Sequence, residues 1–245
     1  MRYLAIVLSL ALGACAAGYV PPPEQIAADS GRVTDAREIV VLSEDDAAIA
    51  RLTAEALPLG YSPVSDVPTE ALGLTVRVLE IPAGQSGPGA IRELEALEPG
   101  ILAGVNHAYD ARNEMVERAG RSYADDFLRW PAAGCPALRP VGVIDAAPRA
   151  GARDWAVHRA FFRGTATQDD HGWIVADLIA DPARLTGAQI YMADVVGRNR
   201  NGAEAASVDA IVAALAWMHG EGVELVNISL AGPYNKILDR TFAQA

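Results

Sequence analysis

The chain has 245 residues, of which 51% are apolar and 21% are charged, a composition that excludes a mostly disordered chain, a collagen-like repeat and a coiled coil. Its 20 basic and 31 acidic side chains give a net charge of −11, which argues against nucleic-acid binding because that function needs a basic face. Two cysteines, Cys15 and Cys135, are too few for a disulfide framework or a cysteine-rich metal site.

The N-terminus is predicted to be a targeting segment. Residues 1–14 place Arg2 before an apolar run from Leu4 to Leu12, which is too short to span a bilayer and is typical of a signal peptide. The run ends in Leu12-Gly13-Ala14-Cys15, which resembles a bacterial lipobox. That resemblance implies lipidation of Cys15 and a partner membrane in the bacterial cell envelope. The alternative is an ordinary secretory signal and a secreted protein.

Residues 15–36 are rich in proline and polar residues and predict a linker, after which residues 37–110 predict a small folded domain. Ser43 is expected to cap its first helix. The expected elements are strand Glu38–Leu42, helix Asp45–Leu57, strands Gly60–Ser65 and Leu72–Ile81, helix Pro88–Leu97 and strand Ile101–Ala108. This βαββαβ order predicts a ferredoxin-like α+β domain.

Residues 111–138 predict a connector, and from residue 139 strands alternate with helices. The expected elements are strand Val141–Asp145, helix His171–Ala180, strand Ala188–Val196, helix Ala203–His219, strand Val223–Ser229 and helix Tyr234–Ala245. Such alternation favours an α/β layer with a mostly parallel sheet. Ligand sites of these sheets lie at the carboxyl ends of the strands, where Asp145 and the segment Ser229–Gly232 are expected.

Three segments in this part, VGVIDAA, HGWIVADLIA and NISLAGP, resemble in content and order the motifs of the subtilisin-like serine peptidases. The resemblance implies that residues 139–245 are part of a subtilisin-like peptidase domain. It further implies that Asp145 orients an imidazole and that His171 is the general base. The stretch Ser229, Leu230, Ala231 and Gly232 would line the cleft and pair with a peptide substrate in extended conformation.

Residues 37–110 fit the same resemblance, since subtilases are commonly made with a βαββαβ propeptide that inhibits the enzyme. The chain's own propeptide would then be a second partner of the cleft. We expect its Asn106–Tyr109 strand to enter the cleft beside Ser229–Gly232.

The family's nucleophilic serine and oxyanion-hole asparagine follow the N-x-S-L segment, so both are expected beyond Ala245. Ser207 is interpreted as a surface residue or helix cap, and Ser229 as a substrate-binding position. Trp173 stands where the family has threonine, which would place a bulky ring beside the general base. Ala146-Ala147 replaces the usual Thr-Gly. The alternative function is a catalytically inactive envelope lipoprotein, or a gene fragment, that only binds extended peptides.

Neither a metal nor a cofactor is expected. The four histidines, His107, His158, His171 and His219, lack paired ligand spacing, and no Gly-rich phosphate loop precedes a helix.

Overall fold

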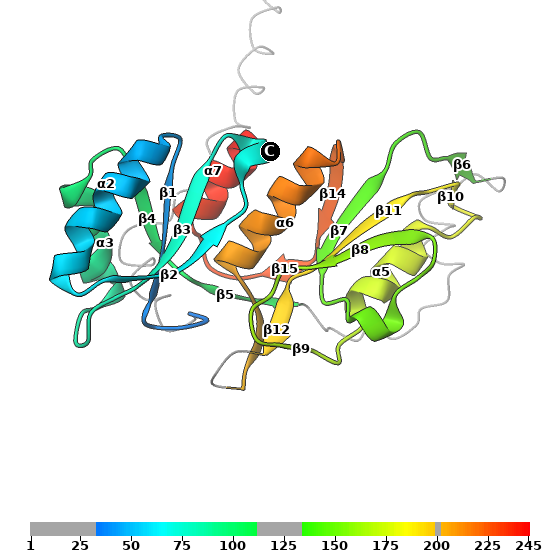
Figure 1. Ribbon diagram of the computed structural model, residues 1–245. Coiled ribbons are helices and arrows are strands. Elements are labelled where there is room, and N and C mark those ends of the chain that lie inside the picture. Colours follow the sequence, from blue (N-terminus) through cyan, green and yellow to red (C-terminus); the bar gives the residue numbers. More distant parts are fainter. Residues whose placement is uncertain (1–32, 112–133, 199–201) are drawn as a thin grey trace, which may run out of the picture.

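The computed structural model describes residues 33–111, 134–198 and 202–245, which form a mixed α/β fold. Five layers follow one another from left to right in Figure 1: helices α2 and α3, an antiparallel sheet, helices α6 and α7, a parallel sheet, and helix α5. The predicted signal peptide of residues 1–14, Cys15, and most of the predicted linker and connector lie outside the described residues.

The first sheet contains the βαββαβ pattern expected from the sequence. Its elements are β1 (Glu38–Ser43), α2 (Asp46–Ala56), β2 (Ser62–Val67), β3 (Thr75–Glu80), α3 (Gly87–Leu97) and β4 (Leu102–Val105). The strand order is β2-β3-β1-β4, and all neighbours are antiparallel. The third strand in chain order is therefore inserted beside the first, which is the split β-α-β arrangement.

Strand β1 is buried on both faces because helices cover the sheet from both sides. Successive side chains of a strand point to opposite faces. Ile39 and Val41 accordingly pack in one core with α2 and α3, whereas Val40 and Leu42 pack in another core with α6. An unbroken apolar run is what such a strand requires.

Two local predictions in this part were wrong. Asp45, not Ser43, caps α2, because its carboxylate accepts a hydrogen bond from Ala47 N at 2.9 Å while Ser43 still belongs to β1. The expected strand Ile101–Ala108 is two strands, β4 and β5 (Ala108–Ala111), which belong to different sheets. The chain leaves the first sheet between them, which periodicity alone does not reveal.

The second sheet is parallel throughout. Its strands are β7 (Val141–Asp145), β8 (Ala156–Ala160), β11 (Ile190–Asp194) and β14 (Leu225–Ile228), in the order β14-β7-β11-β8. Helix α5 (His171–Ile179) packs on one face of this sheet and α6 (Val208–Gly220) on the other. Helices on both faces are the usual cover of a parallel sheet.

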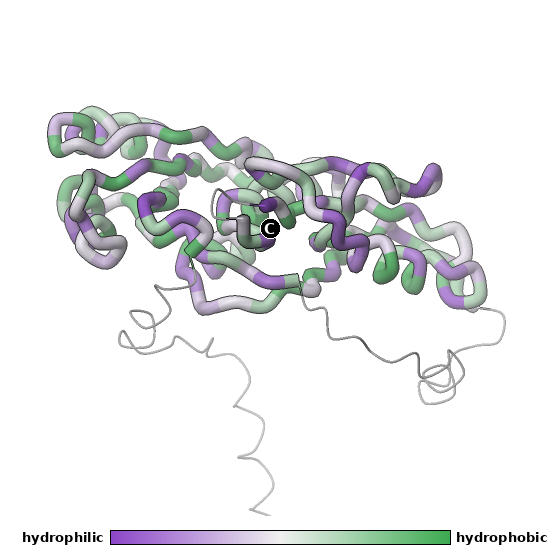
Figure 2. Tube along the Cα trace, turned by 90° about the horizontal axis from the view of Figure 1, so that it is seen from below, coloured by the Kyte–Doolittle hydropathy of each residue, from purple (hydrophilic) through white to green (hydrophobic). Residues whose placement is uncertain are grey.

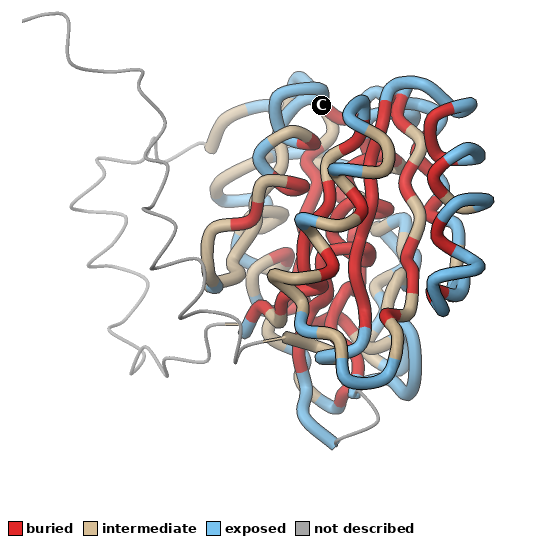
Figure 3. Tube along the Cα trace, turned by 90° about the vertical axis from the view of Figure 1, so that its left-hand side faces the viewer, coloured by how far each residue is buried: buried red, intermediate tan, exposed pale blue. Residues whose placement is uncertain are grey.

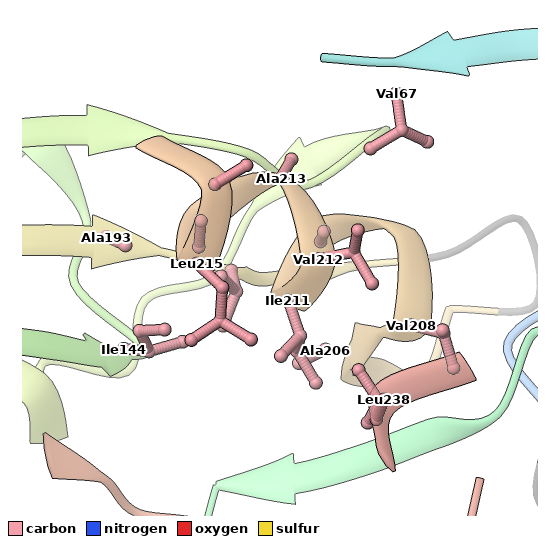
Figure 4. Close-up of a cluster of buried hydrophobic side chains, with 14 of the residues drawn as sticks. Val67, Ile144, Ala193, Ala206, Val208, Ile211, Val212, Ala213, Leu215 and Leu238 are labelled. Atoms are coloured by element: carbon pink, nitrogen blue, oxygen red, sulfur yellow. The ribbon is translucent and has the colours of Figure 1, made fainter. Parts of the chain in front are cut away.

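Helix α6 is the central element of the molecule. Ten of its 13 residues are buried, because it lies between the two sheets. Figure 4 shows its side chains with Ile144 and Ala193 of the parallel sheet and with Val67 of β2. A helix that is apolar all round is expected to be enclosed in this way. Figure 3 shows the buried trace running through the middle layers, with exposed residues on the outer helices and loops.

The third sheet joins segments far apart in the sequence, in the order β15-β5-β13-β12-β9. Its strands besides β5 are β9 (Thr165–Ala166), β12 (Val196–Arg198), β13 (Glu204–Ser207) and β15 (Leu230–Ala231). The expected strand Ala188–Val196 is thus divided between β11 and β12, and the start of the expected helix Ala203–His219 is strand β13. Helix propensity is a weak prior that sheet pairing overrides.

The remaining elements are short, apart from helix α7. They are α7 (Lys236–Gln244), β6 (Cys135–Pro136) paired with β10 (Leu185–Thr186), and the 3-10 turns Leu57–Leu59, Glu70–Leu72 and Arg149–Gly151. Hydrophilic residues interrupt the outer helices in Figure 2, while hydrophobic ones dominate the inner strands. Within the described ranges no helix is both long and apolar enough to cross a membrane.

A partly buried polar cluster joins the first sheet to α6. The Arg163 guanidinium donates to Glu38 Oε1 at 3.0 Å and to Asp209 Oδ2 at 2.9 Å. Asn106 Nδ2 donates to Glu38 Oε2 at 2.9 Å and to Asp209 Oδ1 at 3.0 Å, and its Oδ1 accepts from Val208 N at the start of α6. Two nearly buried carboxylates therefore share one cation.

Candidate active site

Asp145 lies at the carboxyl end of the central strand β7, as the sequence predicts. Its side chain is fully buried and accepts a hydrogen bond from Ala146 N at 2.7 Å. Nδ1 of His171 lies 2.9 Å from Oδ2 and 3.0 Å from Oδ1 of this carboxylate. Burial raises the pKa of Asp145, and the hydrogen bonds from His171 and Ala146 oppose that rise.

His171 is the first residue of α5, and its backbone N–H donates to Asp169 Oδ1 at 3.0 Å. Gly172 allows the helix to approach β7 closely: its N–H donates to Ala146 O at 2.8 Å, and a Cβ on it would lie 2.8 Å from Asp145 Cβ. A residue with a side chain would push the helix away. The HG sequence thus brings the imidazole onto the carboxylate.

The geometry of the pair fixes what it can do chemically. Because Nδ1 faces two carboxylate oxygens, Nδ1 carries the proton, and Nε2 of the neutral ring is left with a lone pair. The His171 side chain is 24% exposed, while the Asp145 side chain is fully buried. The imidazole can therefore accept a proton from an incoming group, and the carboxylate would stabilise the resulting cation.

Trp173 occupies the core and not the exposed part of the site. Its side chain is fully buried, its indole N–H donates to Pro148 O at 2.9 Å, and its ring centroid lies 5.5 Å from that of His158. The ring packs between α5 and the parallel sheet. The expectation of a bulky ring beside the general base was wrong, because the helix turns position 173 inward.

The segment Ser229–Gly232 continues past the edge of the sheet at which Asp145 lies. Ile228 pairs with Ile144, so Ser229 follows opposite Asp145, and its hydroxyl accepts a hydrogen bond from Asn227 Nδ2 at 3.0 Å. Leu230 and Ala231 then form β15, and Gly232 lies under an aromatic ring.

The strand that β15 pairs with is β5. The pairing is antiparallel, with Leu230 opposite Ala111 and Ala231 opposite Asp110. On its other side β5 pairs with β13, also antiparallel. The expected neighbour of the segment was Asn106–Tyr109, and the observed strand Ala108–Ala111 lies two residues further along the chain.

Tyr109 anchors β5 in this position. Its ring lies directly over Gly232, where a Cβ would come within 2.3 Å of the ring. Its hydroxyl donates to Pro233 O at 2.7 Å, and the residue is only 7% exposed. Gly232 is therefore required for the approach of the ring.

Sequence reasoning missed three contributors to this region. The first is β13, which pairs with β5 on the side away from β15, and the second is Tyr109, which holds β5 in position. The third is Asp194, whose carboxylate is buried at the end of β11 opposite Asp145. Asp194 could have been found, because VGVID and IYMAD are both apolar strands that end in aspartate. Of the two interpretations of Ser207, the surface residue was wrong because it is buried, whereas the helix-cap position is confirmed at the N-cap of α6, without a hydrogen bond from its side chain.

The other side chains that could bind a metal do not lie close together in the described part of the chain. Within residues 33–111, 134–198 and 202–245 no group of three or more His, Cys, Asp or Glu side chains is placed to hold a metal ion. Cys135 lies half-buried in β6 as a free thiol. No model of a known protein family and no curated protein matches this chain, so the interpretation of the site depends on its own geometry.

Proposed function

We propose that this chain belongs to a subtilisin-like serine endopeptidase, in which Asp145 and His171 are two members of the catalytic triad. The observation that carries the proposal is the hydrogen-bonded Asp145–His171 pair, which leaves Nε2 of a partly exposed imidazole as a proton acceptor. It lies at the carboxyl ends of parallel strands, where such sheets place their ligand sites.

The position that β5 occupies between β13 and β15, called the groove below, supports a peptide as the substrate. An extended strand already lies between β13 and β15, paired through its backbone to both. A substrate peptide in the same position would gain the same main-chain hydrogen bonds, and a side chain of that peptide would lie over Gly232 where the Tyr109 ring lies now. In the proposal, residues 37–110 act as a propeptide whose last strand holds the groove closed to other peptides.

The reaction follows from the two side chains and a serine nucleophile, which the motif order of the resembled family places after the N-x-S-L segment. His171 Nε2 takes the proton of the serine hydroxyl while the serine oxygen attacks the scissile carbonyl carbon. Asp145 stabilises the imidazolium. The imidazolium then gives its proton to the leaving amine, and water repeats the sequence to release the acyl group.

The test expresses the gene from its own start to its natural stop codon and treats the product with a serine-directed fluorophosphonate. We expect labelling of the wild type and its loss in Asp145→Ala and His171→Ala, because the hydroxyl is then no longer activated. His219→Ala, which changes a histidine at the far end of α6, is the matched control and should label normally.

Labelling that persists in both variants would contradict the proposed triad. Labelling that disappears in Ser229→Ala would instead identify Ser229 as the nucleophile. If no labelling occurs while added peptides still bind, the chain is a peptide-binding lipoprotein. The backbone pairing of β5 with β15 is the observation that favours this second function, because it requires no catalysis.

Tyr109 provides a test of the groove by itself. We expect Tyr109→Ala to free the groove, because it removes a ring that is nearly buried and a hydrogen bond to Pro233. Losing such a side chain costs about 3 kcal/mol, which opens the tethered strand about a hundredfold more often. Binding of a fluorescent peptide with the sequence of residues 106–111 would measure this by anisotropy.

Tyr109→Phe is the control for this measurement. It keeps the ring over Gly232 and loses only the hydroxyl, a change worth about 1 kcal/mol, so it should bind the peptide far less than the alanine variant. Equal peptide binding by wild type and Tyr109→Ala would show that the ring does not hold the strand in place.

We also propose that the protein is anchored in the bacterial cell envelope through Cys15. Replacing Cys15 with serine should abolish incorporation of radiolabelled palmitate, because the thiol is the point at which the lipid is attached. A single acyl chain anchors weakly, so the multiple chains of a lipoprotein are needed for stable attachment. Unchanged label in the variant would favour an ordinary secretory signal.

A further inference from the structure

We propose that Asp194 is a positioning residue for the Asp145–His171 pair, acting through the backbone that follows Asp145. The inference deepens the proposed function and rests on it. Asp194 ends β11 and lies opposite Asp145 in the parallel register, so the two carboxyl groups occupy neighbouring strand ends. Asp194 is 1% exposed, and a buried carboxyl group without a role would be costly.

The hydrogen bonds of Asp194 lead directly to the site. Its Oδ1 accepts from Ala147 N at 3.1 Å, and the Val196 backbone donates to the same carboxyl group. Ala146, the residue before Ala147, accepts a hydrogen bond through its carbonyl oxygen from Gly172 N at 2.8 Å. The Asp194 side chain therefore holds the turn Ala146–Ala147 in place. Helix α5, which begins with His171, packs against this turn.

The rest of the turn is held from the other side. Val195 N donates to Asp145 O at 3.0 Å, and Nε2 of His158 lies 2.8 Å from Ala147 O. Without Asp194, Ala147 N would be a buried donor with no acceptor, and the turn would shift to satisfy it. A shift of this turn moves the Ala146 carbonyl and the start of α5 together.

The surroundings of Asp194 contain few charges. The titratable and charged groups on the elements packed around it include Asp145 on β7 and His158 and Arg159 on β8. Those of α5 and the residues just before it are Asp169, Asp170, His171 and Asp177. The Arg159 guanidinium instead lies over the Phe161 ring, 5.1 Å from its centroid. Burial, with a smaller contribution from the Asp145 charge, raises the pKa of Asp194 to about 6.

The test uses the 245-residue chain and the imidazole of His171, observed by NMR. A proton held between Nδ1 and a carboxylate gives a resolved downfield resonance. We expect Asp194→Leu, which has a similar shape but no acceptor, to lose this resonance, because the turn that positions the imidazole on the carboxylate is no longer held. Asp194→Ala should act in the same way where leucine is not tolerated.

Asp194→Asn is the conservative variant, since its amide oxygen can still accept from Ala147 N. It should keep the downfield resonance, which a loss of packing alone would not explain. Ile190→Val, at the opposite end of β11, is the control for general destabilisation and should leave the resonance unchanged. An unchanged resonance in the folded leucine and alanine variants would overturn the inference.

The outcome for Asp194 is separable from the proposed function. Asp145→Asn removes the carboxylate that faces Nδ1 of the imidazole and should abolish the downfield resonance. If that variant has no effect, the Asp145–His171 pair is absent and the proposed function fails. If it has this effect and the Asp194 variants have none, only the positioning role of Asp194 fails.

Discussion

Replacing Arg163 with alanine is expected to lower the free energy of unfolding by about 3 kcal/mol. The side chains of Glu38 and Asp209 are 8% and 6% exposed, and the variant would leave both without their cation. The Arg163 side chain is 37% exposed, so solvent screens part of the interaction, and the lower end of the range for buried pairs applies. Urea unfolding followed by far-UV circular dichroism measures the change.

Two further variants separate charge from packing in this cluster. Arg163→Lys keeps the positive charge but loses the guanidinium nitrogens that bind Glu38 and Asp209 separately. It should recover part of the stability lost in Arg163→Ala. Adding Glu38→Gln to Arg163→Ala should also recover part of the lost free energy of unfolding, because the uncompensated charge of the Glu38 carboxylate is removed. An Arg163→Ala variant within 0.5 kcal/mol of wild type, where surface substitutions usually fall, would show that the cluster contributes no net stability.

The second large effect is expected for Trp173→Ala, at about 3–5 kcal/mol. The ring is fully buried, and Gly151 packs on it so closely that a Cβ there would lie 2.9 Å from the ring. The variant opens a cavity beneath α5 and leaves Pro148 O without its donor. Because His171 is two residues earlier in the same helix, the downfield imidazole resonance should weaken as well.

Ile174→Ala is the matched control, since it changes the next residue of the same helix but one that is 52% exposed. It should alter stability by no more than about 0.5 kcal/mol. Chemical denaturation of both variants under identical conditions makes the comparison. If Trp173→Ala unfolds at the wild-type denaturant concentration, the ring does not hold α5 on the sheet.

The strands and helices that the sequence predicted correctly are those with simple periodicity. The run EIVVL and the run VGVID are short and apolar because helices cover both faces of their sheets. The position of Asp145 followed from the rule that parallel strands end at one edge. The helix that begins at His171 was predicted from its periodicity, whereas the pairing of His171 with Asp145 was implied only by the resemblance.

What the sequence did not show is where one apolar or polar run is divided between two sheets. Glu204–Ser207 was included in a helix, although it is a strand that pairs with β5 on one side and β12 on the other. The contacts of Arg163 with Glu38 and of Tyr109 with Pro233 join residues more than 120 positions apart. No local pattern encodes such contacts, because they depend on how completed layers meet.

The enclosure of α6 between two sheets has a consequence for the evolution of this sequence. Residues such as Ala210, Ala213 and Ala214 set the spacing between layers that come from opposite halves of the chain. A larger residue there would have to be accommodated on both sides at once, and close-packed interiors tolerate such growth poorly. Drift in the helix should therefore be slow, and an accepted change should be accompanied by compensating changes in β2 and β7 together.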